Sequence, residues 1–135
     1  MKLKAVVNVG CPEDLVIALN NIRGRILVEV LERHLRVKPG SFGPAEFYVQ
    51  NCDFAVSEEP FCEVRLTGIS VSPARAADDF RNARNELEKI YAEVIHQHLL
   101  QGQKMQLFIS VMADRSLPDG SPSLVEGNAI WVGTI

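Results

Sequence analysis

The chain has 135 residues, of which 47% are hydrophobic and 23% are charged, and its formal charge at pH 7 is −3. This size and composition predict one folded domain over residues 1–135 and exclude a largely disordered chain. A protein with this net negative charge has no overall electrostatic attraction for nucleic acids. No apolar run approaches the roughly 20 residues that are needed to cross a bilayer. We therefore expect a cytoplasmic protein without a nucleic-acid or membrane partner, in which the three cysteines remain reduced thiols.

The first segment predicts a strand followed by a helix. In residues 3–9, the odd-numbered positions are all apolar, and the positions between them include Lys4 and Asn8. This alternation is typical of a half-buried strand. Pro12 then opens a helix whose first turn carries two carboxylates near the positive end of the helix dipole. The apolar stripe of this helix extends to about Leu35 and passes through Gly24, which indicates a bend or a close packing contact.

A second strand, over residues 46–52, completes the first unit. Phe47 and Val49 fall on one side of this strand, and Tyr48 and Gln50 fall on the other. A loop or short hairpin over residues 53–60 leads to the second unit. Residues 1–55 therefore predict a strand, a helix and a strand.

Residues 62–113 predict the same order of elements. The first strand of this unit changes its apolar phase at Gly68, which indicates a β-bulge. A helix starts near Pro73, carries one apolar stripe and reaches about Leu100, and a strand follows over residues 105–112. A helix of this length between two strands predicts a parallel crossover, which is right-handed in nearly all proteins.

Two such units predict an α+β domain of two layers, with the helices on one face of the sheet. The duplication is one of element order and not of residue identity. A C-terminal strand tail over residues 126–135 carries Trp131 and needs an apolar cover, for which a neighbouring subunit is the candidate. A ferredoxin-like domain has the same order of elements and is the structural alternative.

From residue 62 onward, the sequence resembles a known family. The resemblance rests on the strand that begins at Glu63, the helix start with Arg75, the helix end near His98, the strand from Gln106 to Val111, and the run Gly127-Asn128-Ala129-Ile130-Trp131. In this order they resemble the 5-carboxymethyl-2-hydroxymuconate isomerase family of the tautomerase superfamily, which also includes macrophage migration inhibitory factor. The first half of the chain resembles the family in element order.

The resemblance implies a fold, an assembly and a reaction. The subunit would have a four-stranded mixed sheet with two helices on one face. That sheet would face inward in a homotrimer, with the C-terminal strands reaching across to neighbouring subunits. Members isomerise small enolisable carboxylates by keto-enol tautomerisation, without a cofactor or a metal. A homotrimer with a small carboxylate ligand is therefore the expected assembly.

The chain departs from the family at its proton shuttle. Members use an N-terminal proline, a secondary amine that takes a proton from one carbon and returns it to another. This chain begins Met1-Lys2, and a lysine at position 2 is too large to favour removal of Met1. The candidate bases are therefore the Met1 α-amine, with an ordinary pKa of about 8, and the Lys2 ε-amine in a desolvated pocket. The alternative is that both residues form a frayed strand start.

The basic residues with which members hold the substrate carboxylate are also not evident, since residues 40–45, which enter the second strand, contain no arginine. The substrate-binding candidates are Tyr48, Arg65 and Trp131, since polar or aromatic groups at strand positions can line a cleft between subunits. Packing in a subunit interface is their alternative role.

The histidines, cysteines and adjacent glutamates give weaker chemical signals. His96 and His98 are two residues apart on a helix, so they point in different directions and do not predict a metal site. Cys52 and His34 would form a nucleophile and its base only if the fold brought them together. The adjacent carboxylates Glu58-Glu59 are an acid/base pair or solvated loop charges.

Two classes of function follow from these observations. The first is an isomerase of small enolisable carboxylates that uses an altered amine base. The second is a non-catalytic homotrimer that binds a small molecule or serves as an assembly module.

Overall fold

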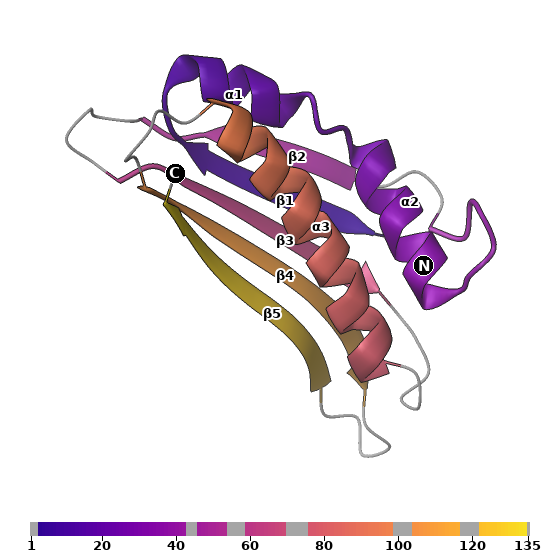
Figure 1. The fold of residues 1–135 in the computed structure, drawn as a ribbon. Coiled ribbons are helices and arrows are strands. Elements are labelled where there is room, and N and C mark those ends of the chain that lie inside the picture. The colour runs from indigo at the N-terminus through magenta and orange to yellow at the C-terminus, as the bar shows by residue number, and fades with distance from the viewer. Residues whose placement is uncertain are drawn as a thin grey trace.

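Three helices and five strands make up the chain in the computed structural model, which describes residues 3–42, 46–53, 59–69, 76–98, 104–116 and 122–134. The strands form a single sheet, and all three helices lie on one face of it (Figure 1). The elements in chain order are β1 (Lys4–Gly10), α1 (Glu13–Asn20), α2 (Gly24–Leu35), β2 (Glu46–Asn51), β3 (Phe61–Ile69), α3 (Ala76–His98), β4 (Lys104–Ser116) and β5 (Pro122–Thr134).

The sheet is mixed, with the strand order β2-β1-β3-β4-β5. β1 pairs in parallel with β2, and β3 pairs in parallel with β4, so each predicted crossover joins two parallel neighbours. The inner strands β1 and β3 are antiparallel, which joins the two crossover units into one sheet. The class is α+β, as predicted.

The C-terminal strand extends the sheet beyond the four strands that were expected. β5 begins at Pro122, earlier than the predicted tail over 126–135, and pairs antiparallel with β4 along its whole length. Its register places Trp131 opposite Leu107. The partner strand of β5 is therefore β4 of the same chain, so the expectation of four strands was one strand short.

The prediction of one continuous N-terminal helix was wrong, because the helix breaks between Asn20 and Gly24. The chain leaves the first helix through a tight turn, in which the Ile22 N–H donates to the Leu19 carbonyl at 3.0 Å. Ile22 is buried, so this turn is anchored in the core. α2 then begins at Gly24, where a Cβ would lie 3.2 Å from Cγ of Phe47. Gly24 therefore marks both the bend and the close contact that its position predicts.

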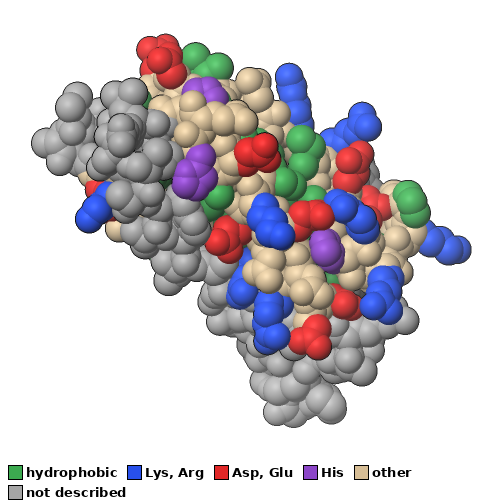
Figure 2. All heavy atoms as spheres, in the orientation of Figure 1, with side chains coloured by type: hydrophobic (Ala, Val, Ile, Leu, Met, Phe, Trp, Pro, Cys, Tyr) green, Lys and Arg blue, Asp and Glu red, His purple; other side chains and the backbone are tan. Residues whose placement is uncertain are grey.

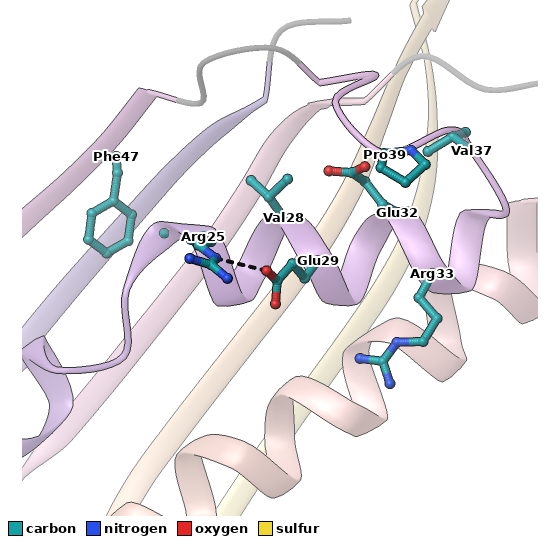
Figure 3. Close-up of a pocket in the computed structure, with 9 residues that line it drawn as sticks. Arg25, Val28, Glu29, Glu32, Arg33, Val37, Pro39 and Phe47 are labelled. Atoms are coloured by element: carbon teal, nitrogen blue, oxygen red, sulfur yellow. Dashed lines mark hydrogen bonds and ion pairs between the residues drawn. The ribbon is translucent and has the colours of Figure 1, made fainter.

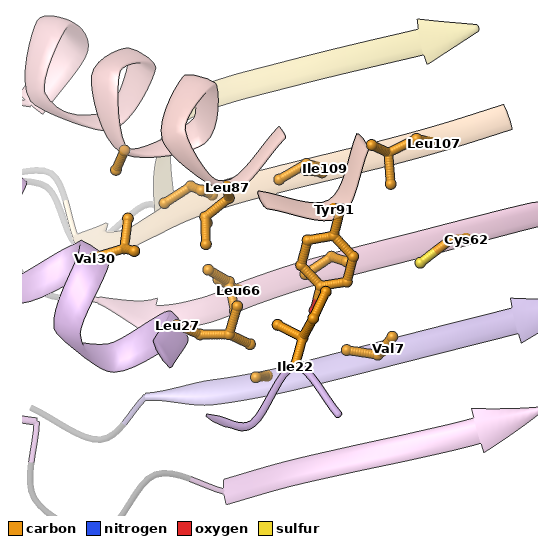
Figure 4. Packing of buried hydrophobic residues seen from close by; sticks show 14 of the residues in the cluster. Val7, Ile22, Leu27, Val30, Cys62, Leu66, Leu87, Tyr91, Leu107 and Ile109 are labelled. Atoms are coloured by element: carbon orange, nitrogen blue, oxygen red, sulfur yellow. The ribbon is translucent and has the colours of Figure 1, made fainter. Parts of the chain in front are cut away.

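The core lies between the helices and one face of the sheet. Alternate residues of β1, β3 and β4 are buried there, as their two-residue periods predict. The apolar stripe of α3 meets them at steps of three and four (Figure 4). The buried residues of these four elements are Ala5, Val7, Val9, Cys62, Val64, Leu66, Ile69, Phe80, Ala83, Leu87, Tyr91, Ile95, Met105, Leu107, Ile109 and Val111.

No helix or strand in the described part of the chain covers the opposite face of the sheet (Figure 1). We call it the open face and define it by the alternate strand residues that are half-buried or exposed. It mixes charged, amide and aromatic side chains. Its members are Lys4, Val6, Asn8, Glu46, Tyr48, Gln50, Phe61, Glu63, Arg65, Thr67, Lys104, Gln106, Phe108 and Ser110.

The predicted β-bulge in β3 is confirmed. The register between β3 and β4 shifts between Leu66 and Ile69, and Gly68 has a φ of 80°. The shift returns Ile69 to the buried face, where it is fully enclosed. Since an L side chain rarely adopts this backbone conformation, glycine suits the position.

Gly68→Ala is expected to lower the free energy of unfolding by about 1–2 kcal/mol, because alanine must adopt the left-handed region there. Urea denaturation followed by circular dichroism measures the change. Thr67→Ala is the matched control, since Thr67 does not have a positive φ. It should cost less than about 1 kcal/mol. An equal cost for both variants would contradict the requirement for a positive φ.

Candidate functional site

Two of the three substrate-binding candidates lie in one row across the open face. Val6 of β1 is paired with Tyr48 on one side and with Arg65 on the other. Because neighbouring strands are about 4.8 Å apart, the backbones of Tyr48 and Arg65 are separated by about 10 Å. The side chain of Trp131 lies outside the described residues, as do Met1 and Lys2, the candidate bases. The structure therefore places Tyr48 and Arg65 in the same row, one on each side of Val6.

Arg65 is held on the open face by a carboxylate of its own strand. Its Nε lies 2.9 Å from Oε1 of Glu63, and the same oxygen accepts a hydrogen bond of 3.3 Å from the Asn8 side-chain amide. The Arg65 side chain is still 59% exposed. Its terminal guanidinium nitrogens make no hydrogen bond to another described residue, so they can face a ligand from this fixed position.

Lys4 is a member of this group that the sequence did not single out. Its ammonium lies 5.5 Å from the centre of the Tyr48 ring, within the range of a cation–π contact. The alternation in residues 3–9 contained the signal, because it places Lys4 on the same face as Val6. What the sequence lacked was the register that sets Val6 beside Tyr48. Lys4 is thus a second cation on the open face, beside Tyr48, whereas Arg65 lies beside Val6.

A groove lies on the other side of the sheet, between α2 and β2 (Figure 3). Its volume is about 620 Å³, within the range of roughly 300–1,000 Å³ that is usual for small-molecule sites. Phe47 forms one end, and the segment that follows α2 forms the other. The lining residues are Gly24, Arg25, Val28, Glu29, Glu32, Arg33, Val37, Pro39 and Phe47.

The end of α2 shapes this groove. Arg36 caps the helix in the left-handed conformation, with a φ of 56°, and turns the chain back. The Val37 N–H then donates to the Glu32 carbonyl at 3.2 Å, and the Gly40 N–H donates to Oε2 of the Glu32 side chain at 2.7 Å. These bonds hold the segment that carries Val37 and Pro39 against the helix. Of the features that form the groove, the sequence indicated only the bend or close contact at Gly24.

The buried cysteines are not activated nucleophiles. Burial raises the pKa of Cys11 to about 11, and burial next to Cys11 raises the pKa of Cys62 to about 12. Burial also raises the pKa of Tyr91, whose hydroxyl finds no hydrogen-bond partner among the described residues. All three groups therefore stay protonated at neutral pH, where a thiol is a poor nucleophile.

Cys52 and His34 are not brought together. The Cys52 N–H donates to the Val9 carbonyl at 2.7 Å, near the end of β1 and β2. His34 lies in the last turn of α2, near the opposite end of these strands, with Nε2 3.6 Å from a carboxylate oxygen of Glu86. The nucleophile-and-base pair that these two residues offered therefore has no structural support.

The remaining titratable residues form no metal site within the described ranges, where no three His, Cys, Asp or Glu side chains cluster. His98 contacts the Val94 carbonyl at 2.9 Å through Nδ1. Glu59 accepts a hydrogen bond of 3.4 Å from the Gln106 side chain, while Glu58 lies outside the described residues. The adjacent glutamates are therefore not shown as an acid/base pair.

Charges of both signs are interspersed over the helix layer (Figure 2). The ion pairs there include Arg33 with Glu86 and Arg81 with Asp78. This pattern matches the solvated helix faces that the alternating charges predict. None of the helices, among the residues that the structure describes, combines the length and apolar character needed to cross a membrane.

Comparison with known proteins gives no relative. No family model, no curated protein and no solved structure matches the chain.

The three thiols are expected to react in a fixed order. In the native protein at pH 8, a thiol reagent should modify the half-buried Cys52 first. A pKa raised from 9.0 to about 11 lowers the thiolate fraction of Cys11 about a hundredfold, and burial blocks access to it. Peptide mass spectrometry after timed alkylation measures each site, and unfolding in urea should equalise the rates. Native modification of Cys11 or Cys62 as fast as Cys52 would contradict this assignment.

Proposed function

We propose that this chain is a tautomerase-like protein that assembles as a cytoplasmic homotrimer and binds a small carboxylate on its open face. The observation that carries the proposal is the open face itself. It exposes Val6, Tyr48 and Phe108 beside a fixed arginine, opposite a sheet face on which alternate residues of β1, β3 and β4 are buried. A sheet with one dry face and one mixed, half-apolar face is suited to association.

The arrangement of strands supports this proposal. Two parallel crossover units lie side by side, with their inner strands antiparallel and all helices on one face. The family resemblance implies this kind of subunit, with its sheet directed toward the axis of a trimer. The free thiols support a reducing compartment.

The charges of the open face support a carboxylate ligand. Lys4 and Arg65 flank Val6 and Tyr48 on this face, where Glu63 is engaged by Arg65 and Asn8, and Glu46 is paired in register with Lys4. A guanidinium held by one carboxylate keeps its remaining donors in a fixed direction. A small anion that bridges the ammonium and the guanidinium would neutralise both and could accept from the tyrosine hydroxyl.

A keto-enol isomerase is the second candidate function. The same strand order favours it, because the resemblance implies chemistry at the chain start, just before Lys4 on β1. In that reaction, the neutral Met1 α-amine or Lys2 ε-amine would remove a proton from carbon and return it to another carbon. The carboxylate of the substrate would rest on Lys4 and Arg65, and no group in the described residues would need to act as a nucleophile.

Light scattering after size exclusion tests the assembly. The expected mass is three times the 15.0 kDa of one chain. Phe108→Asp places a charge at the half-buried centre of the open face and should dissociate the trimer, because an unpaired buried charge is costly. Ile17→Asp is the matched control, since Ile17 is 57% exposed on α1, on the helix side of the molecule. A monomeric wild-type chain, or equal dissociation in both variants, would reject the assembly.

Ketonisation of phenylenolpyruvate tests the isomerase candidate. If the Met1 α-amine is the base, the rate should rise with pH until about pH 8, because the amine must be neutral to accept a proton. Acetylation of the terminal amine should abolish the activity, whereas Lys2→Gln should spare it. Arg65→Gln should raise KM about tenfold if Arg65 holds the carboxylate. Activity that survives both acetylation and Lys2→Gln would exclude an amine base.

A further inference from the structure

We propose that the groove between α2 and β2 binds a small organic cation, namely an amine carried on an apolar or aromatic body. The groove lies on the helix side of the sheet, so it is separate from the open face. Phe47 lines the groove, whereas the next residue along β2, Tyr48, belongs to the open face. The proposed cation therefore differs in both position and charge from the carboxylate proposed above.

The walls of the groove fit the apolar part of such a ligand. Val28 extends from α2, Val37 and Pro39 come from the segment that follows α2, and Phe47 stands on β2 (Figure 3). Val28, Val37 and Phe47 are only half-buried, so a ligand can still remove apolar surface from water. A Cβ at position 24 would lie 3.2 Å from Cγ of Phe47, so glycine allows the ring to lie close to the start of α2. The result is a preformed apolar site of the usual size.

Both arginines of the groove are already neutralised. Arg25 Nε donates to Oε1 of Glu29 at 2.9 Å, one turn along the same helix. Arg33 makes two hydrogen bonds, of 2.9 and 2.6 Å, to the two carboxylate oxygens of Glu86. Figure 3 shows the Arg33 side chain directed toward α3 and away from Phe47. Each of these cations therefore has its charge offset by a neighbouring carboxylate, which lowers its attraction for an anionic ligand.

Glu32 is the acidic residue of the groove that has no ion-pair partner among the described residues. Its Oε2 accepts the Gly40 N–H at 2.7 Å, which fixes the carboxylate, but it makes no ion pair with another described residue. Arg36 and Lys38, the nearest basic residues that follow in the chain, are exposed and make no such pair with it. A half-buried carboxylate beside apolar walls is best satisfied by a cation that brings its own hydrogen-bond donors.

Calorimetric titration of the full-length chain with 2-phenylethylamine tests the site. Saturable binding is expected, with NMR shifts confined to the amides of residues 24–29, 32–40 and 47. The counter-probe is 3-phenylpropionate, which has a similar body and the opposite charge. It should bind at least about tenfold more weakly, because Glu32 repels its carboxylate and each arginine of the groove already has a carboxylate beside it.

Two variants separate the role of Glu32 from a general effect of charge. Glu32→Gln keeps an oxygen that can accept the Gly40 N–H and removes the charge, so amine binding should weaken about tenfold while the fold persists. Glu13→Gln removes the same charge from an exposed position on α1 and should leave binding unchanged.

Four results would overturn the proposal. They are no saturable amine binding at millimolar concentration, equal binding of both probes, equal weakening in both variants, and shifts that map to the open face. None of these readouts depends on the oligomeric state or on isomerase activity. A failure here is therefore distinguishable from a failure of the proposed function.

Discussion

The parallel pairing within each half of the sheet is the constraint on which the rest of the structure depends. A parallel pair cannot be joined by a tight turn, so each half needs a crossover that packs helix on sheet. One half of the sheet is the pair β2-β1 and the other is the pair β3-β4. Because β1 and β3 are antiparallel and each has its parallel partner on its outer side, a rotation of 180° about an axis perpendicular to the sheet exchanges the two halves. Rotation preserves handedness, so two crossovers of the same hand place their helices on the same face. One sheet face is thereby packed and the other is left open.

The two halves satisfy this constraint in different ways. The crossover of the second half is one long helix, α3, whose residues Phe80, Ala83, Leu87, Tyr91 and Ile95 are buried. The first half divides its crossover into α1 and α2, because the buried Ile22 pulls the turn between them into the core. α2 therefore approaches β2 at Gly24 and Phe47 and leaves space farther along. The groove therefore exists because α2 covers only one end of the edge strand β2.

The sequence predicted the features that depend on neighbours along the chain. The strand β2, the helix α3 and the phase change at Gly68 follow from local patterns, and each element appears as expected, although the burial of β2 does not alternate. The helix break was missed because the burial of Ile22, a tertiary contact, overrides the continuing apolar stripe. The intrachain pairing of β5 was missed for a related reason. An apolar tail signals that it needs a partner, but register with β4 is a long-range property.

The candidate sites show the same division between local and long-range information. Tyr48 and Arg65 could be chosen from strand position, but only the register through Val6 makes them neighbours. Lys4 joins them through the Tyr48 ring, and Glu32 becomes an isolated charge only when the surrounding arginines find their own partners. No residue type alone distinguishes Glu32 from Glu29, one turn earlier on the same helix. The difference is set by the partners that the fold supplies.

Adjacent residues on an edge strand can therefore serve two separate chemistries. Phe47 and Tyr48 are neighbours in β2, yet the pleat turns one toward α2 and the other toward the open face. The groove that Phe47 lines has apolar walls and a carboxylate, Glu32, without an ion-pair partner among the described residues, whereas Tyr48 lies beside the Lys4 ammonium. Since charge complementarity selects ligands of opposite sign, the two faces of this strand would not compete for the same molecule. A shift of one residue in the register of β2 would exchange these side chains and remove both sites together.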